Sequence, residues 1–318
     1  MSISIGFSIM RTSEYAALIA SRRHGRVNAT DLISEVREII LRDLRREDCN
    51  FYVRNDRFAG HKSISKIPEE IVKDPSLESF DLQTVSVDGH KVATYSGGNV
   101  ASYITVAEKD SLMPFPYLYM NKIAVGQEAY GVVDIREAPS ANVKRVARAL
   151  KKYVENITVC FLDRDRNKAM IEEVKACGAR IALIQDGDIS ASLATAFDGR
   201  IDMMMGYGGA QEGVLTAAGM KCLGGYIVGQ LYLPNSADEQ LAKSYGINDL
   251  EAVYDIDDLV KSDKVAFTAT GITDGYFLDG VRFEKDGAVT HSIMAKSDTK
   301  TLRKVRTRHY FDFKQIFS

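Results

Sequence analysis

Short apolar segments alternate with amphipathic ones through residues 139–224, and this alternation constrains the fold more than any other feature. The segments "ITVCFLD", "RIALIQ" and "DMMMGYG" have the composition of buried strands. Each is followed by a segment with helical spacing: "NKAMIEEVKACG", "DISASLATAF" and "EGVLTAAGMKC". Strands that alternate with helices over such short distances predict a parallel or mixed sheet covered on both faces. We therefore expect an α/β protein.

The N-terminal part has a different pattern. Residues 13–23 have helical Ala and Leu spacing, and a second helix is predicted to begin at Thr30 as its N-cap. Further along, strand-like segments are separated by glycine pairs, and Asp88-Gly89 is a hairpin signal. These features favour helices followed by an antiparallel-rich sheet.

The change of pattern near Pro139 predicts two units. A chain of 318 residues can hold one large or two ordinary domains. We place an N-terminal α+β domain at residues 1–138 and a C-terminal α/β domain at residues 139–318.

The charge balance argues against nucleic acid and membrane partners. The formal net charge is −2, so no global field attracts polyanions or anionic membranes. The densest basic stretch, "KTLRKVRTRH", alternates basic and apolar residues and is typical of a half-exposed strand. No apolar run approaches the roughly 20 residues that span a bilayer. We expect a soluble, cytoplasmic protein.

The pattern of the four cysteines also favours the cytoplasm. They are scattered without CxxC spacing, which favours neither a disulfide framework nor a zinc site. Cys160, inside the apolar run "ITVCFL", is predicted to be buried, and Cys49, beside two acidic residues, to be unreactive. These features are typical of a reducing environment.

Three loops that follow the predicted strands carry polar and glycine residues. They are "DRDRN" (163–167), "DGD" (186–188) and "GYGGAQE" (206–212), and "TGITDG" (270–275) follows a later strand. In open α/β sheets, ligands bind outside the carboxyl ends of the strands. Arg164 and Arg166 could contact a phosphate in bidentate fashion, and glycines let backbone N–H groups converge on an anion.

The acidic residues of these loops suggest a sugar phosphate rather than a bare anion. Asp186 and Asp188 cannot attract phosphate, but they suit sugar hydroxyls or a metal ion that holds phosphate. Each loop also has a structural interpretation: "DGD" as a turn with an Asp helix cap, "DRDRN" as a solvated face with local ion pairs. The glycine loop has neither GKS/T nor the dinucleotide GxGxxG.

An ordered series of motifs resembles the class II fructose-1,6-bisphosphatase family. The matching segments are "FSIMRTSEYAALIA", "YLYMNKIAVG", "QDGDISAS", "GYGGAQEGVLTAA", "FTATGITDG" and "KSDTKTLRKVRTRHY". The resemblance implies the layered α/β/α/β/α fold of the lithium-sensitive sugar phosphatases, as a homo-oligomer. It also implies hydrolysis of the 1-phosphate of fructose 1,6-bisphosphate or sedoheptulose bisphosphate with Mg²⁺ or Mn²⁺.

The resemblance also assigns substrate-binding positions. Residues that match the family's sugar-phosphate site are Tyr119, Arg164, Asp165, Arg166, Asp186, Asp188 and Gly209. Arg164 stands where the family usually has lysine, so the positive charge is kept with a different geometry.

The family's metal ligands are only partly matched. Glu212 corresponds to a metal-ligand carboxylate, Asp31 in "RVNATD" to another, and Asp88 in "SVDGHKVATYSGGN" to a third. The resemblance makes these three the catalytic and metal-binding carboxylates. The family's "GEGE"-type segment has no counterpart; "KIPEEIV" offers Glu69 and Glu70 without the glycines. The "DPIEGT"-type segment has lost its Glu and Thr.

Three functions remain open on the sequence. The first is a divalent-metal-assisted sugar (bis)phosphate phosphatase, which the family resemblance favours. The second is an isomerase, epimerase or lyase that acts on a sugar phosphate on the same scaffold without the metal pair. The third is a non-catalytic sugar-phosphate-binding pseudoenzyme. In each case the ligand is a small-molecule sugar phosphate.

Overall fold

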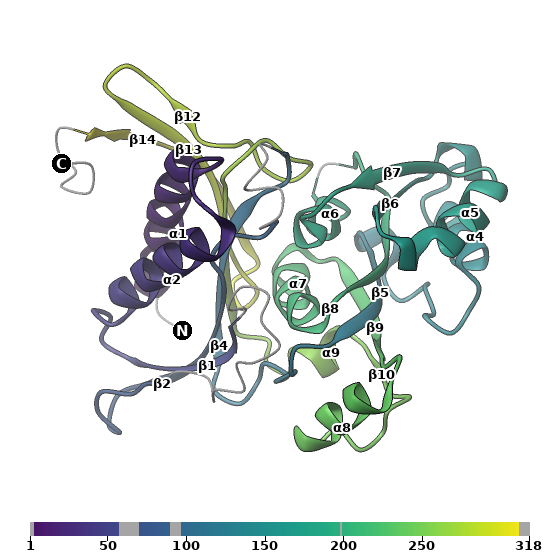
Figure 1. Cartoon of the computed structure of the whole chain (residues 1–318), viewed down its shortest axis with the longest axis horizontal. Coiled ribbons are helices and arrows are strands. Elements are labelled where there is room, and N and C mark those ends of the chain that lie inside the picture. The colour runs from purple at the N-terminus through teal and green to yellow at the C-terminus, as the bar shows by residue number, and fades with distance from the viewer. Residues whose placement is uncertain (1–2, 57–69, 90–96, 198, 312–318) are drawn as a thin grey trace.

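The computed structural model describes residues 3–56, 70–89, 97–197 and 199–311. Within these residues the chain forms two sheets, with helices between them and on both outer sides (Figure 1).

The first sheet is built from both ends of the chain. Its described strands run in the order β12-β13-β11-β4-β3-β1-β2, with β14 paired to β13. The pairs are antiparallel except for β1 with β3. The bounds are β1 Asn50–Asp56, β2 Glu70–Ile71, β3 Ser79–Val85, β4 Ala101–Glu108, β11 Val265–Gly271, β12 Arg282–Phe283, β13 Gly287–Lys296 and β14 Thr301–Tyr310.

The second sheet is mixed, as the β-α alternation predicts. Its described strands run in the order β10-β9-β5-β8-β6-β7, and β6 is parallel to both β7 and β8 while β5 is antiparallel to β8 and β9. The bounds are β5 Tyr119–Val125, β6 Thr158–Leu162, β7 Arg180–Ile184, β8 Met203–Gly209, β9 Tyr226–Tyr232 and β10 Val253–Tyr254.

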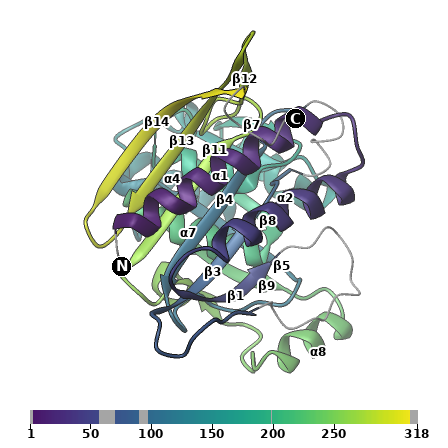
Figure 2. The same ribbon diagram turned by 90° about the vertical axis from the view of Figure 1, so that its left-hand side faces the viewer.

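The helices complete five layers, which confirms the predicted α/β/α/β/α arrangement. α1 and α2 cover the outer face of the first sheet, α6 and α7 lie between the sheets, and α4 and α5 cover the far face of the second (Figures 1 and 2). The bounds are α1 Ile3–Arg23, α2 Ala29–Leu44, α4 Pro139–Ala149, α5 Lys168–Ala176, α6 Asp188–Ala194, α7 Ala210–Leu223, α8 Ser236–Ser244 and α9 Ile256–Leu259, with short 3₁₀ turns at Gln127–Ala129, Val154–Asn156 and Asp165–Asn167.

The buried helix α7 fills the middle layer. Apolar residues lie on all sides of it rather than in one stripe, because both of its faces contact a sheet. Gly219 lets α7 pack closely against α6 and β11, because a Cβ there would lie 2.6 Å from Leu193 Cδ2 and 3.1 Å from Phe267 Cζ. Phe267 of β11 is fully buried, and its ring centroid lies 6.2 Å from that of Tyr103.

Local details of the N-terminal part differ from the sequence prediction. α1 begins at Ile3, well before residue 13, and the N-cap of α2 is Asn28, whose Oδ1 accepts from the Asp31 N–H at 2.9 Å. The predicted hairpin at Asp88-Gly89 is wrong: β3 ends at Val85, and the register pairs Val85 with Tyr103 of β4. A two-residue turn at Asp88-Gly89 cannot join strands in that register.

The two sheets do not divide the chain at residue 138. β5, at Tyr119–Val125, belongs to the second sheet, while β11 to β14, between residues 265 and 310, return to the first. The stretch "KTLRKVRTRH" forms β14, where exposed and half-buried residues alternate as the pattern predicts.

The cysteines are free thiols, in agreement with the sequence prediction. Cys160 is fully buried, and burial raises the pKa of its thiol to about 12. Burial, followed by the negative charge of Glu47, raises the pKa of Cys49 to about 11. Both thiols are therefore protonated and unreactive at neutral pH. Among the described residues, no helix is long and apolar enough to cross a membrane.

We expect Phe267→Ala to lower the free energy of unfolding by about 3–5 kcal/mol, because it leaves a cavity between α7 and the first sheet. Phe283→Ala is the matched control, since Phe283 on β12 is 44% exposed, and its effect should stay within about 0.5 kcal/mol. Urea unfolding measures both, and equal losses would contradict the packing described for α7.

Candidate active site

Three polar loops meet at one edge of the second sheet. Because β6 is parallel to β7 and β8, the segments that follow them leave the sheet on the same side. The first sheet reaches the same place through Asn99: a Cβ on Gly187, where φ is +83°, would lie 2.8 Å from Asn99 Cβ. The loops that the sequence singled out therefore do converge, and the segment that leads into β4 of the first sheet joins them.

Arg166 and Tyr119 form the exposed part of this edge. The Arg166 guanidinium carbon lies 4.5 Å from the centroid of the Tyr119 ring, and its Nε donates to the Tyr207 carbonyl at 3.2 Å. The cation–π contact and the hydrogen bond fix the guanidinium at this edge of the sheet. Arg164 is held by its own hydrogen bonds, from Nη1 to the Asp163 carbonyl at 2.8 Å and from Nη2 to the Gln185 carbonyl.

Asp165 stands apart from these contacts. Its side chain is 94% exposed and pairs with Lys168 at 2.7 Å. The hydrogen bond from Lys168 holds the pKa of Asp165 below its ordinary value. This matches the interpretation of part of "DRDRN" as a solvated face with a local ion pair.

Sequence reasoning missed the roles of Asn167 and Tyr207, which hold this edge in place. Asn167 is fully buried; its Nδ2 donates to the Leu162 carbonyl at 2.8 Å, and its Oδ1 accepts from the Tyr207 N–H at 3.0 Å. These bonds tie the loop after β6 to β8. The ring of Tyr207 lies 4.6 Å from that of Tyr232, centroid to centroid.

Beneath the edge lies a buried ion pair between Lys122 and Asp188. The Nζ–Oδ2 distance is 2.6 Å, and the side chains are 0% and 7% exposed. Lys122 Nζ also donates to the Gly209 carbonyl at 3.3 Å. Lys122 lies on the face of β5 that also carries Met120 and Ala124, both in the core between the sheets. The available signal was a single lysine within the apolar strand "YMNKIAV".

The glycine loop makes room for acidic side chains. A Cβ on Gly208 would lie 2.7 Å from Lys122 Cε and closer still to Asp188 Oδ2, while one on Gly209 would lie 2.5 Å from Glu212 Cδ. These glycines are therefore required by the packing of the Lys122–Asp188 pair and of Glu212. The sequence argument had assigned them only to backbone contacts with an anion.

Glu212 lies in the first turn of α7 and is 2% exposed. The same turn contacts the first sheet, because Nε2 of the buried Gln83 on β3 donates to the Gln211 carbonyl at 2.6 Å. Glu212 is thus held where the middle layer meets both sheets.

Asp88 and Asp188 lie near the same buried tyrosine. Asp88 is 1% exposed, and its N–H donates to the Ala101 carbonyl at 2.9 Å. Burial, and next the charge of Asp88, raise the pKa of Tyr103 well above its ordinary value, with Asp188 adding to the effect. Gly89 is close to the "DGD" loop, since a Cβ there would lie 3.5 Å from Asp186 Cβ.

Asp31 has a different environment from the other two predicted metal ligands. It is exposed at the start of α2, where its Oδ2 accepts from Asn28 Nδ2 at 2.6 Å. α2 and α7 cover opposite faces of the first sheet (Figure 1). In the part of the chain that the structure describes, no three Asp, Glu, His or Cys side chains form a group that could hold a metal ion. Asp31, Asp88 and Glu212 therefore do not form such a group in the described part of the chain. Glu69 lies outside the described residues.

We expect Lys122→Met to lower the free energy of unfolding by about 3–5 kcal/mol, because it leaves the Asp188 carboxylate buried without its cation. The double variant Lys122→Met/Asp188→Asn should recover part of that loss. Lys168→Met, which breaks the exposed pair with Asp165, should leave the unfolding midpoint unchanged. Chemical denaturation tests all three, and a Lys122→Met midpoint equal to that of Lys168→Met would contradict the buried pair.

Comparisons with known proteins identify the family. The model of the family described as "Bacterial fructose-1,6-bisphosphatase, glpX-encoded" matches residues 3–309. A D-fructose 1,6-bisphosphatase class 2/sedoheptulose 1,7-bisphosphatase from Synechococcus elongatus is 31% identical over 342 residues, which cover 98% of each chain. One from Thermosynechococcus vestitus is 36% identical over 259 residues, 77% of this chain and 73% of the relative.

Among solved structures, the extragenic suppressor protein suhB from Bartonella henselae aligns over 63% of this chain and 75% of its own, with a TM-score of 0.39 and 13% identity. The family match spans nearly the whole sequence and includes each of the loops that meet at the carboxyl ends of β6, β7 and β8. The chain belongs to the bacterial glpX-type fructose-1,6-bisphosphatase family.

Proposed function

We propose that the protein hydrolyses a phosphate ester of a sugar bisphosphate, of the kind represented by fructose 1,6-bisphosphate and sedoheptulose bisphosphate. The observation that carries this proposal is the position of Arg166 on the Tyr119 ring, at the same sheet edge as the "DGD" loop. Family membership supports the reaction class.

Different residues of the site bind the phosphate and the hydroxyl groups of the ligand. Arg166 and Arg164 present guanidinium groups that can bind one phosphate of the substrate, and Tyr119 supports the first of them. Asp186 and Asp188 accept hydrogen bonds from sugar hydroxyls. The Gly209 carbonyl shares Lys122 Nζ with Asp188 and so lies close to that carboxylate. Asp165, exposed and paired with Lys168, contributes to the charge at the rim.

Asp88 and Glu212 are the carboxylates we assign to a divalent cation, Mg²⁺ or Mn²⁺, which would hold the second phosphate. Both are almost fully buried, and both lie close to the loops that bind the sugar. Asp88 and Glu212 would hold this cation, whose chemistry would be to neutralise charge on phosphoryl oxygens and to lower the pKa of a bound water. The described residues alone do not provide a group of three ligands for it, and Asp31, on the outer helix layer, is not part of this assignment.

The location, oligomeric state and partners of the protein are also proposals. We propose that the protein acts in the cytoplasm as a homo-oligomer, with no nucleic acid or membrane partner. The free state of all four cysteines and the low net charge support this environment.

Purified protein supplied with Mg²⁺ or Mn²⁺ should release inorganic phosphate from fructose 1,6-bisphosphate. Arg166→Gln should raise KM about tenfold or more, because a charge-assisted contact with phosphate is lost. Arg136→Gln is the control: Arg136 is 71% exposed and pairs with Asp134 away from this edge. Steady-state phosphate release measures both variants. Conversion of sugar phosphates without free phosphate, followed by NMR, would contradict the proposal and favour an isomerase, epimerase or lyase.

Glu212→Gln should lower kcat about a hundredfold or more while fructose 1,6-bisphosphate still binds, because the change removes a charge without changing the shape of the side chain. Chelation with EDTA should abolish turnover, and Mn²⁺ or Mg²⁺ should restore it. Ligand-induced thermal stabilisation reports binding separately from turnover. A wild-type protein that is stabilised by the sugar bisphosphate but never turns it over would refute hydrolysis and indicate a pseudoenzyme.

A further inference from the structure

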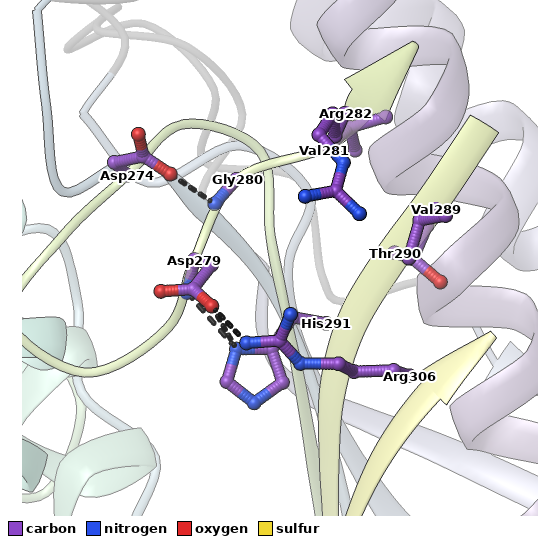
Figure 3. A pocket seen from close by; sticks show the side chains of 9 residues that line it. All are labelled: Asp274, Asp279, Gly280, Val281, Arg282, Val289, Thr290, His291 and Arg306. Atoms are coloured by element: carbon purple, nitrogen blue, oxygen red, sulfur yellow. Dashed lines mark hydrogen bonds and ion pairs between the residues drawn. The ribbon is translucent and has the colours of Figure 1, made fainter. Parts of the chain in front are cut away.

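A cavity lies beside strands β12, β13 and β14 of the first sheet. It has a volume of about 410 Å³ and lies between the segment that follows β11 and the β12–β13–β14 part of the first sheet (Figure 3). Cavities of several hundred cubic ångströms are the size that holds small metabolites. Its lining includes Asp274, Asp279, Arg282, His291 and Arg306, and none of the residues assigned to substrate or cation above.

Two guanidinium groups face this cavity from different strands. Arg306 of β14 lies directly opposite His291 of β13, and Figure 3 shows the Arg282 guanidinium directed into the space beside them. Arg306 Nη2 is 2.6 Å from Asp279 Oδ2, so this carboxylate holds the guanidinium against the wall. Arg282 is held less tightly, since its Nη2 lies 3.9 Å from Glu284 Oε1.

The acidic residues of the cavity lining, Asp274 and Asp279, lie on one loop, which hydrogen bonds hold in place. The Asp279 N–H donates to His291 Nδ1 at 3.1 Å, and the Gly280 N–H donates to Asp274 Oδ1 at 2.8 Å. Asp279 therefore ties the loop to both His291 and Arg306. The 274–280 loop can move relative to the arginines only if these hydrogen bonds and the ion pair between Asp279 and Arg306 are replaced by other contacts.

This loop is in direct contact with the candidate active site. The Asp274 carbonyl accepts from the Asn99 N–H at 2.9 Å, and Asn99 Oδ1 accepts from the Tyr276 N–H at 2.8 Å. Asn99 in turn packs against Gly187, between the two aspartates of the "DGD" loop. A continuous series of contacts through the backbone and side chain of Asn99 thus joins the cavity wall to the loop that carries Asp186 and Asp188.

We propose that this cavity binds a sugar phosphate monoester as an effector, and that its occupancy is transmitted through Asn99 to the "DGD" loop. The phosphate accepts hydrogen bonds from Arg282 and Arg306, whose planar groups suit its oxygens. Sugar hydroxyls donate to Asp274 and Asp279 at the opposite wall. Arg306 exchanges Asp279 for the phosphate, and the 274–280 loop then changes its contact with Asn99. The site is separate from the proposed catalytic function and does not depend on turnover.

The test of binding uses glucose 6-phosphate as the probe and Arg166→Gln as the background, which weakens the candidate active site. Calorimetry should detect binding to R166Q and a loss of about tenfold or more in R166Q/R282Q, where a charge-assisted contact is removed. R166Q/R308Q is the matched control, because Arg308 is a half-exposed β14 arginine that pairs with Glu284 and Asp286 outside the cavity lining. No binding to R166Q, or an equal loss in both double variants, would overturn the site.

The test of coupling uses amide hydrogen exchange on the same proteins. Glucose 6-phosphate should change exchange in peptides that contain Asn99 and Gly187 in R166Q, and should leave them unchanged in R166Q/R282Q. Binding without any change at these two segments would overturn the transmission through Asn99. Equal unfolding midpoints of the variants show that the fold is intact, and neither readout involves phosphatase activity.

Discussion

The ion pair between Lys122 and Asp188 is the interaction on which the rest of the site depends. It joins the inner face of β5 to the first residue of α6, in the layer between the sheets. Removing two charges from water is costly, and only close geometry offsets that cost. Gly208 lets β8 pass next to the pair, because any side chain at this position would collide with it. The charge pair and the glycine therefore form one structural unit.

The site is assembled from both sheets rather than from one half of the chain. Tyr119 of β5 and the loops after β6 and β7 supply the second sheet's part, Arg166 and "DGD" among them. The connection between β3 and β4 of the first sheet supplies Asp88 and Asn99. The middle layer joins them, since Glu212 lies in a turn of α7 that receives a hydrogen bond from Gln83 of β3. The chain completes the first sheet only after it has built the second, so its C-terminal strands lie against its N-terminal ones.

The sequence predicted the local pattern well because that pattern depends on neighbouring residues. The alternation of strands and helices between residues 158 and 223 and the half-exposed character of β14 follow from periodicity alone. The convergence of the "DRDRN", "DGD" and "GYGGAQE" loops followed from the rule for parallel strands. The layered architecture came from the family resemblance.

Long-range contacts account for what was missed. No local signal shows that β11 pairs with β4, so that β11 to β14 extend the first sheet. None shows that Val85 pairs with Tyr103, which excludes a hairpin at Asp88-Gly89. Lys122 is recognisable only as a lysine in an apolar strand until its partner Asp188, 66 positions later, is in place. The role of Gly208 likewise depends on side chains from β5 and α6.

The central claim is that one sheet edge binds a sugar bisphosphate, with phosphate at Arg164 and Arg166 and hydroxyls at Asp186 and Asp188. A crystal structure of the protein soaked with fructose 1,6-bisphosphate tests it most directly. We predict one phosphate against the Arg166 guanidinium beside Tyr119, the sugar over the "DGD" loop, and the other phosphate toward Asp88 and Glu212. A sugar bisphosphate bound elsewhere, with this edge occupied only by solvent, would contradict the account.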